Sequence, residues 1–157
     1  MTMTEADTSA ISRMRCREIM TKNVRTASLD TSIREAALLM RDGDMGAVPV
    51  IDKSKLVGIV TDRDIVVRAV AEGREATTPV RDVMTTELFT VSPDDFVFQA
   101  IRLMGDKQIR RVPVMDSGGA LVGIIAIADV ALETEDEREI AETMEEISSG
   151  SSFWTRS

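Results

Sequence analysis

The sequence predicts an α/β (α+β) protein built from two pseudo-symmetric repeats, and a duplicated pattern is the main reason. Arg17-Glu18-Ile19-Met20-Thr21 returns about 64 residues later as Arg81-Asp82-Val83-Met84-Thr85. Val48-Pro49-Val50-Ile51-Asp52 returns as Val112-Pro113-Val114-Met115-Asp116. A period of this length is typical of a duplicated supersecondary unit. Within each copy, short Val- and Ile-rich runs alternate with helical spacing, which predicts the order strand, helix, strand, strand, helix.

Each repeat is expected to open with a short strand and a helix. The strands are predicted at Val24–Thr26 and Leu88–Val91. Apolar residues at helical spacing then predict one buried stripe per copy, which includes Met40 in the first and Met104 in the second. In the second copy, Ser92-Pro93-Asp94-Asp95 offers an N-cap, a proline for the first turn and early acids, so the helix is expected to begin there.

A hairpin and a second helix are expected next. The hairpin strands are predicted at Ala47–Ile51 with Leu56–Val60, and at Arg111–Met115 with Leu121–Ile125. Pro49 and Pro113 cannot donate to a sheet, so their strands should lie at an edge or begin irregularly. In the first copy, a helix is predicted over Asp62–Glu72, with Gly73 as its C-cap.

The predicted division of the chain has five parts. They are an arm without order at residues 1–13, repeats at 14–73 and 80–132, an acidic amphipathic helix at 134–148 and a flexible tail at 149–157. From residue 129 to 147 the chain carries nine acids and one base, which accounts for the net charge of −8. The narrow apolar stripe of the acidic helix predicts that it docks on its own core or on a partner chain.

Composition excludes several kinds of site. The chain has no His, which removes zinc sites with His ligands and Ser-His-Asp or Cys-His catalysis, so no metal site and no catalytic residue are predicted. A lone Cys16 cannot form an intrachain disulfide, so nothing suggests an oxidising compartment, and we expect an unremarkable thiol in a cytoplasmic protein. No run is long enough to span a membrane, and an acidic chain without a basic stripe is a poor candidate for nucleic acid.

Thr61 and Asp64 are the first candidate site residues, and two interpretations stay open. Their spacing has the form of a capping box, with Asp in place of the usual Glu. The same groups can face a cleft between the repeats, where a carboxylate accepts hydrogen bonds from the vicinal diol of a ribose. Both interpretations can hold together.

Arg110 and Arg111 are a second candidate, and two interpretations stay open for them: a solvated pair at the start of a strand, or a site that binds phosphate. They precede Val112-Pro113, whereas the aligned residues of the first repeat are Gly46 and Ala47. The fold therefore does not demand this basic pair. A guanidinium suits phosphate by its fork geometry, and Arg63 is a third base assigned to the same role.

The Met-Thr openings, the Val-Pro-Val-x-Asp strands and the segment Gly58-Ile59-Val60-Thr61-Asp62-Arg63-Asp64 together resemble a tandem pair of cystathionine β-synthase (CBS) domains, a Bateman module of the stand-alone prokaryotic type. The resemblance covers residues 15 to about 132. It implies two β-α-β-β-α units packed sheet to sheet, usually as a homodimer. It also implies adenosine-containing ligands such as AMP, ADP, ATP, NAD or S-adenosylmethionine in clefts between the repeats.

Carried over by motif, the resemblance gives each candidate a role. Thr61 and Asp64 match the ribose-binding positions, and Arg111, with Arg110, matches the basic position that contacts phosphate. The adenine pocket is matched by Thr21, Val24, Ala47 and Val48. In the second copy Asp129 remains, but Ala126 replaces the hydroxyl residue, so we expect one good site per chain and a degenerate second one.

The predicted function is that of a non-catalytic regulatory module. It would sense an adenine nucleotide, signal through a ligand-dependent change in the CBS dimer, and be read by an unidentified protein target. The alternative is an interaction protein that binds no nucleotide and docks through its acidic C-terminal helix. The two differ in whether the purified protein takes up an adenine nucleotide.

Overall fold

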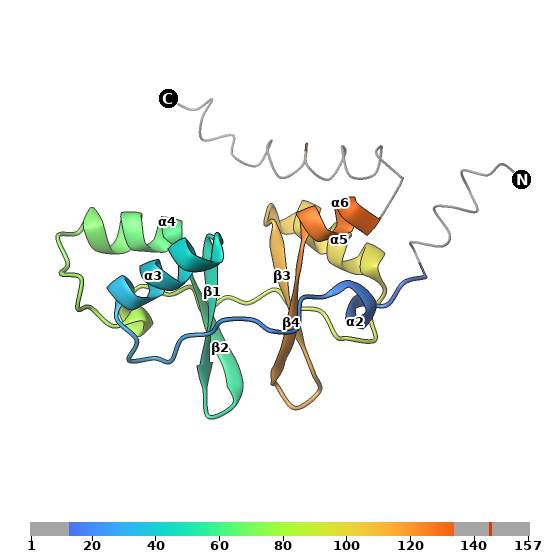
Figure 1. Ribbon diagram of the computed structural model, residues 1–157, viewed down its shortest axis with the longest axis horizontal. Helices are drawn as coiled ribbons and strands as arrows, with labels where there is room; N and C mark the ends of the chain where they lie inside the picture. The colour runs from blue at the N-terminus through green and yellow to red at the C-terminus, as the bar shows by residue number, and fades with distance from the viewer. Residues whose placement is uncertain (1–12, 134–144, 146–157) are drawn as a thin grey trace, which may run out of the picture. The chain divides into compact units, whose positions relative to one another are not determined.

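The computed structural model describes residues 13–133 and Glu145. Its helices and strands, shown in Figure 1, are α2 (Cys16–Ile19), α3 (Ile33–Gly43), β1 (Ala47–Asp52), β2 (Lys55–Thr61), α4 (Asp62–Asp64), a π-helix (Ile65–Val70), a 3-10 helix (Val80–Asp82), α5 (Val97–Lys107), β3 (Arg111–Met115), β4 (Leu121–Ala126) and α6 (Ile127–Glu133). The mixed fold class and both hairpins are confirmed. The predicted acidic helix and tail, and the N-terminal arm apart from Arg13, lie outside the described residues, with Glu145 as the one described residue beyond α6.

The two hairpins are two-stranded antiparallel sheets, β1–β2 and β3–β4. Pro49 is accommodated in β1 because its carbonyl accepts a hydrogen bond from the Ala27 N–H (2.9 Å), while its missing N–H leaves no donor to satisfy. Pro113 accepts the Val91 N–H in the same way (3.1 Å). The strands predicted at Val24–Thr26 and Leu88–Val91 are wrong. In each copy the chain makes only a single parallel bridge there, from Ala27 to Val50 and from Val91 to Val114.

The first long helix, α3, begins where its sequence can cap it. The Ser32 hydroxyl accepts the Glu35 N–H at 3.1 Å, and Met40 is buried as predicted. Met104 on α5 is buried too, but α5 begins at Val97, and the predicted start at Ser92 is wrong.

The reason for the late start of α5 is tertiary. The Ser92–Asp95 segment forms a turn, with the Ser92 N–H bonded to the Asp95 carboxylate at 2.8 Å. Its carbonyls at Pro93 and Asp95 accept the N–H groups of Arg17 and Cys16, at 3.1 and 2.8 Å. These partners lie far away in sequence and hold the segment out of the helix.

The helix predicted over Asp62–Glu72 lies in the expected place but changes its pitch. Three α-helical residues, Asp62–Asp64, are followed by a π-helix over Ile65–Val70. The bond from the Ala71 N–H to the Val66 carbonyl (2.9 Å) has the wider spacing of that helix. Gly73 follows with a φ of +72°, a conformation that favours glycine and confirms its place at the end of the helix.

The chain forms two compact units, which we name by their hairpins. The β1–β2 unit comprises residues 23–88 and 118–121, and the described residues of the β3–β4 unit are 13–22, 89–117 and 122–133. Each Met-Thr opening lies with the hairpin of the other repeat, because Thr21 pairs with Ile124 and Thr85 pairs with Ile59. The compact units therefore cut across the sequence repeats.

Glycines make room for the exchanged openings, by which we mean the two Met-Thr segments that each lie on the hairpin of the other repeat. A Cβ on Gly58 would lie 2.7 Å from the Met84 sulfur, and a Cβ on Gly123 would lie 2.7 Å from the Met20 sulfur. Real Cβ contacts are not this short, so each glycine lets the methionine of an opening cross its strand.

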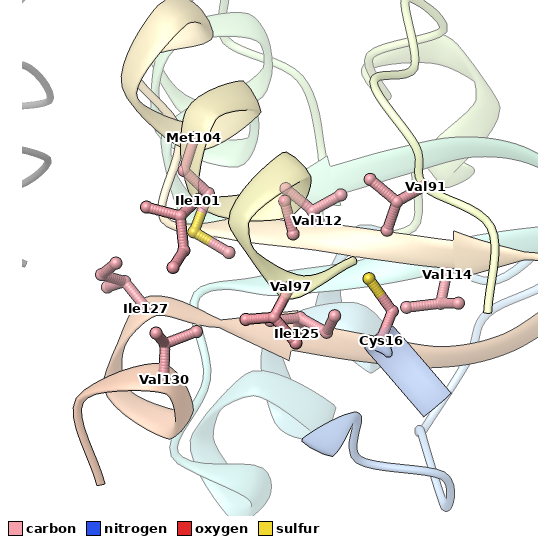
Figure 2. Packing of buried hydrophobic residues seen from close by; sticks show 11 residues of the cluster. Cys16, Val91, Val97, Ile101, Met104, Val112, Val114, Ile125, Ile127 and Val130 are labelled. Carbon is pink, nitrogen blue, oxygen red and sulfur yellow. The ribbon is translucent and has the colours of Figure 1, made fainter. Parts of the chain in front are cut away.

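Each unit has its own apolar core. In the β3–β4 unit, shown in Figure 2, the core joins the bridge residue Val91 with side chains of α2, α5, β3, β4 and α6. These are Cys16, Val97, Ala100, Ile101, Met104, Val112, Val114, Ile125, Ile127 and Val130. In the β1–β2 unit it consists of Ala27, Ile33, Ala36, Met40, Val48, Val50, Val60, Ala69, Val80 and Val83. Burial raises the pKa of the Cys16 thiol to about 11, and the nearby Asp95 carboxylate adds to the shift. Cys16 is a fully buried thiol, which the sequence alone did not predict.

Candidate functional site

Thr61 and Asp64 form the capping box that their spacing predicts. The Thr61 hydroxyl accepts the Asp64 N–H at 3.0 Å, and the Asp64 carboxylate accepts the Thr61 N–H through Oδ2, also at 3.0 Å. The box stands at the end of β2, where the chain enters α4. It satisfies two backbone donors at the start of the helix.

Asp64 has more partners than a cap requires. The Thr85 hydroxyl lies 3.2 Å from both Asp64 carboxylate oxygens and donates to them. The Arg68 guanidinium approaches Oδ1 at 3.8 Å. Within the described part of the chain, Asp64 is the one charged or polar residue classed as buried, at 7% exposure. A carboxylate that is both buried and surrounded by donors is suited to binding hydroxyl groups.

Arg68 joins Asp64 to the exchanged opening. It lies one helical turn after Asp64, and its Nη1 donates to the carbonyls of Val83 (3.4 Å) and Met84 (3.3 Å). These residues immediately precede Thr85. The acid, the base and the hydroxyl therefore form one polar cluster in the β1–β2 unit, which we call the Asp64 cluster: Thr61, Asp64, Arg68 and Thr85.

The other predicted residues of the β1–β2 unit lie at varied depths. Ala47 is half-buried and pairs with Thr61 across the hairpin, which places it beside the Asp64 cluster. Val48 is fully buried, with its side chain in the core of the β1–β2 unit. Val24 is half-buried, and Arg63 is exposed, with its N–H donated to the Asp62 carboxylate at 2.8 Å.

The remaining predicted residues belong to the β3–β4 unit. Thr21 is exposed there and exchanges backbone hydrogen bonds with Ile124. Arg110 accepts the Ile127 N–H on its carbonyl (2.9 Å), and the half-buried Arg111 begins β3. Asp129 accepts the Ala126 N–H at 3.2 Å, which is one half of a capping box.

Sequence reasoning missed Thr85. The family motif assigns Thr21 to the adenine pocket, but the structure places Thr21 in the β3–β4 unit and Thr85 on the Asp64 carboxylate. Thr85 is the counterpart of Thr21 in the second repeat. The alignment of the repeats therefore shows that Thr85 is equivalent to Thr21. It does not show that each Met-Thr opening lies on the hairpin of the other repeat.

Metal-binding clusters and membrane-spanning helices are both absent from the described residues. No group of three or more His, Cys, Asp and Glu side chains among them is arranged to hold a metal ion. None of the helices in the same residues has both the length and the apolar character needed to cross a membrane.

Comparison with known proteins identifies the repeats. The family model of the CBS domain matches residues 16–70 and 80–136. The CBS domain-containing protein YhcV of Bacillus subtilis (strain 168) is 44% identical over 116 residues, which are 74% of this chain and 82% of that protein.

Solved structures agree with this match. The crystal structure of Hypoxic Response Protein I with two coordinated zinc ions has a TM-score of 0.69 at 32% identity, and covers 76% of this chain and 98% of its own. The CBS domain pair of protein MJ0100, in complex with 5′-methylthioadenosine and S-adenosyl-L-methionine, has a TM-score of 0.68 at 30% identity, and covers 76% of this chain and 94% of its own. CBS pairs are regulatory modules. The present chain belongs to the CBS domain family.

Proposed function

We propose that this chain is a non-catalytic regulatory module that binds an adenosine-containing ligand through Thr61 and Asp64. The observation that carries the proposal is the Asp64 carboxylate, which is buried at the end of β2 and has hydroxyl and guanidinium partners beyond its cap. A ribose presents a vicinal diol, and each of its O–H groups can donate to one carboxylate oxygen. The MJ0100 pair, 30% identical, supports the ligand class because it was solved with two adenosine compounds.

We assign the remaining roles from the same resemblance. Arg111, with Arg110 and Arg63, would contact phosphate in ligands such as AMP, ADP, ATP or NAD. Thr21, Val24, Ala47 and Val48 would line the adenine pocket. Asp129 would contribute little, because the residue at the Thr61 position of its repeat is Ala126.

We further infer that the chain acts as a homodimer. The π-helix after α4 exposes three valines, Val66 (58%), Val67 (51%) and Val70 (67%), which are the large apolar side chains exposed in the described residues. A second copy would cover them and remove apolar surface from water. Sedimentation equilibrium that gives a monomer near 17.2 kDa at micromolar concentration would contradict this assembly.

Isothermal titration calorimetry with adenosine, AMP and ATP tests the ligand-binding proposal. The Asp64→Ala variant should bind at least about tenfold more weakly, because a hydrogen bond to a charged group contributes roughly 1.5–3 kcal/mol. Asp129→Ala is the matched control and should stay within about threefold of the original chain. Arg111→Ala should weaken AMP and ATP more than adenosine, since adenosine carries no phosphate.

Asp64 also caps a helix, so the unfolding midpoint of each variant must be measured in the same sample. An original chain that takes up none of the three compounds would refute the proposal. It would favour the interaction protein that binds no nucleotide.

A further inference from the structure

The Thr85 hydroxyl occupies the position on Asp64 that a diol would use. Its oxygen is equidistant from the two carboxylate oxygens, at 3.2 Å from each. A vicinal diol that bridges a carboxylate likewise brings one O–H group to each of its two oxygens. The Thr61 N–H binds Oδ2, and the Asp64 side chain is 10% exposed, which leaves little other access.

The Thr85 backbone is fixed, so only its side chain can move aside. The Thr85 N–H donates to the Ile59 carbonyl at 2.8 Å, and the Ile59 N–H donates to the Thr85 carbonyl at 2.9 Å. The two bonds of this bridge hold the Cα in place beside β2. The hydroxyl can therefore leave Asp64 by rotation about Cα–Cβ, a fast and local motion.

The fold does not require the contact between the Thr85 hydroxyl and Asp64, as the equivalent residues Thr21 and Asp129 of the β3–β4 unit show. Thr21 makes the same backbone bridge, to Ile124, at 2.9 and 3.0 Å. Yet in the described structure no hydrogen bond joins the Thr21 hydroxyl to Asp129, and Thr21 is exposed. The hydroxyl–carboxylate contact is thus a specific property of the Asp64 cluster.

We propose that Thr85 sets the affinity of the Asp64 site: its hydroxyl competes with the ligand's diol for the carboxylate and must rotate away when the diol binds. The inference rests on the proposed function, since it concerns how Asp64 exchanges one hydroxyl partner for another. The competition should therefore affect ligands with a vicinal diol and not ligands without one. A ligand with a vicinal diol must displace Thr85, whereas a ligand without one gains nothing from that displacement.

Calorimetric titration with adenosine and 2′-deoxyadenosine tests the competition, with Thr85→Ala as the variant and Thr85→Ser as the matched control. Removal of the competing donor should tighten adenosine binding about three- to tenfold, while 2′-deoxyadenosine changes less than about twofold. Thr85→Ser keeps the hydroxyl and should keep the affinity ratio of the original chain. A second measurement needs no variant: three-bond NMR couplings to the Thr85 methyl should report a change of χ1 with adenosine and none with 2′-deoxyadenosine.

The outcomes separate this inference from the function on which it rests. If the original chain binds adenosine and Thr85→Ala leaves the adenosine to deoxyadenosine ratio unchanged or reduces it, the function stands and the competition is refuted. An unchanged χ1 on adenosine binding would refute it as well. If neither the original chain nor Thr85→Ala binds adenosine, the proposed function fails and this inference fails with it.

Discussion

Asp64 and Asp129 occupy the same position in the two repeats, but their surroundings differ. Both carboxylates accept the N–H of the residue three positions earlier, at 3.0 and 3.2 Å. The buried Asp64 carboxylate also accepts the Thr85 hydroxyl and lies near Arg68, and the Asp64 N–H donates to the Thr61 hydroxyl. Asp129 is half-buried, and the residue three positions before it is Ala126. One half of the capping box is therefore enough to begin the helix. The additional groups around Asp64 exceed what the fold needs, which is why we assign Thr61 and Asp64 to binding and Thr85 to the control of affinity.

The largest effect on stability is expected where the exchanged openings cross the strands. A Cβ on Gly123 would lie 2.9 Å from the Thr21 carbonyl oxygen, whereas a Cβ on Gly58 would lie 3.1 Å from the Thr85 carbonyl oxygen. Backbone yields less readily than a methionine side chain, so Gly123→Ala should cost about 1–3 kcal/mol of unfolding free energy, and Gly58→Ala less. Urea denaturation of both variants measures the difference. Equal costs would show that the two crossings are equivalent.

A smaller effect on the unfolding free energy is expected from substitutions at Thr61 and Ala126, the two residues that differ between the caps. Thr61→Ala should lower the unfolding free energy by about 0.5–2 kcal/mol, because the Asp64 N–H loses its acceptor. Ala126→Thr should supply the missing half of the box at Asp129 and raise stability by up to about 1 kcal/mol. Thermal unfolding of the two single variants and the double variant tests this. A loss of stability in Ala126→Thr would mean that the β3–β4 unit has no room for the hydroxyl.

The smallest effect concerns a pair of core positions. Cys16 and its repeat counterpart Val80 are both fully buried, one in each unit. Cys16→Val replaces one sulfur with two methyl groups of slightly larger volume, and it should change stability at pH 7 by less than about 1.5 kcal/mol because valine already fills the equivalent position.

The pH dependence of the same variant should separate the thiol from its packing. Burial raises the pKa of Cys16 from 9.0 to about 11, so between these values the unfolded chain releases a proton that the folded chain keeps. The stability of the original chain should be fully present below pH 9 and should fall as the pH rises through 11, with about 1 kcal/mol lost at pH 10. Cys16→Val should lack this component. If the unfolding free energies of the two proteins fall equally between pH 9 and about 11, Cys16 is not the source of the pH dependence.

What the sequence could predict was local. Thr61 and Asp64 lie three residues apart, so their capping box follows from spacing alone, and the stripes ending at Met40 and Met104 follow from helical periodicity. The start of α5 could not be predicted, because backbone groups of Cys16 and Arg17 hold the turn before it.

The same limit applies to the site. Thr85 lies 21 residues after Asp64, and no local rule connects them. Its role depends on the openings being exchanged between the units, which the alignment of two repeats cannot reveal, since the aligned residues are the same whether or not they are exchanged.

The exchange of the openings also bears on the order in which the chain can fold. The β1–β2 unit draws almost all of its residues from the continuous stretch 23–88, so it can form while the later part of the chain is still being synthesised. The β3–β4 unit must wait, because Thr21 pairs with Ile124 and this closes a loop of about 100 residues. If the β1–β2 unit folds first, it shortens that loop and reduces the entropy lost in closing it. A fragment meant to fold alone should therefore follow residues 23–88 and not a sequence repeat.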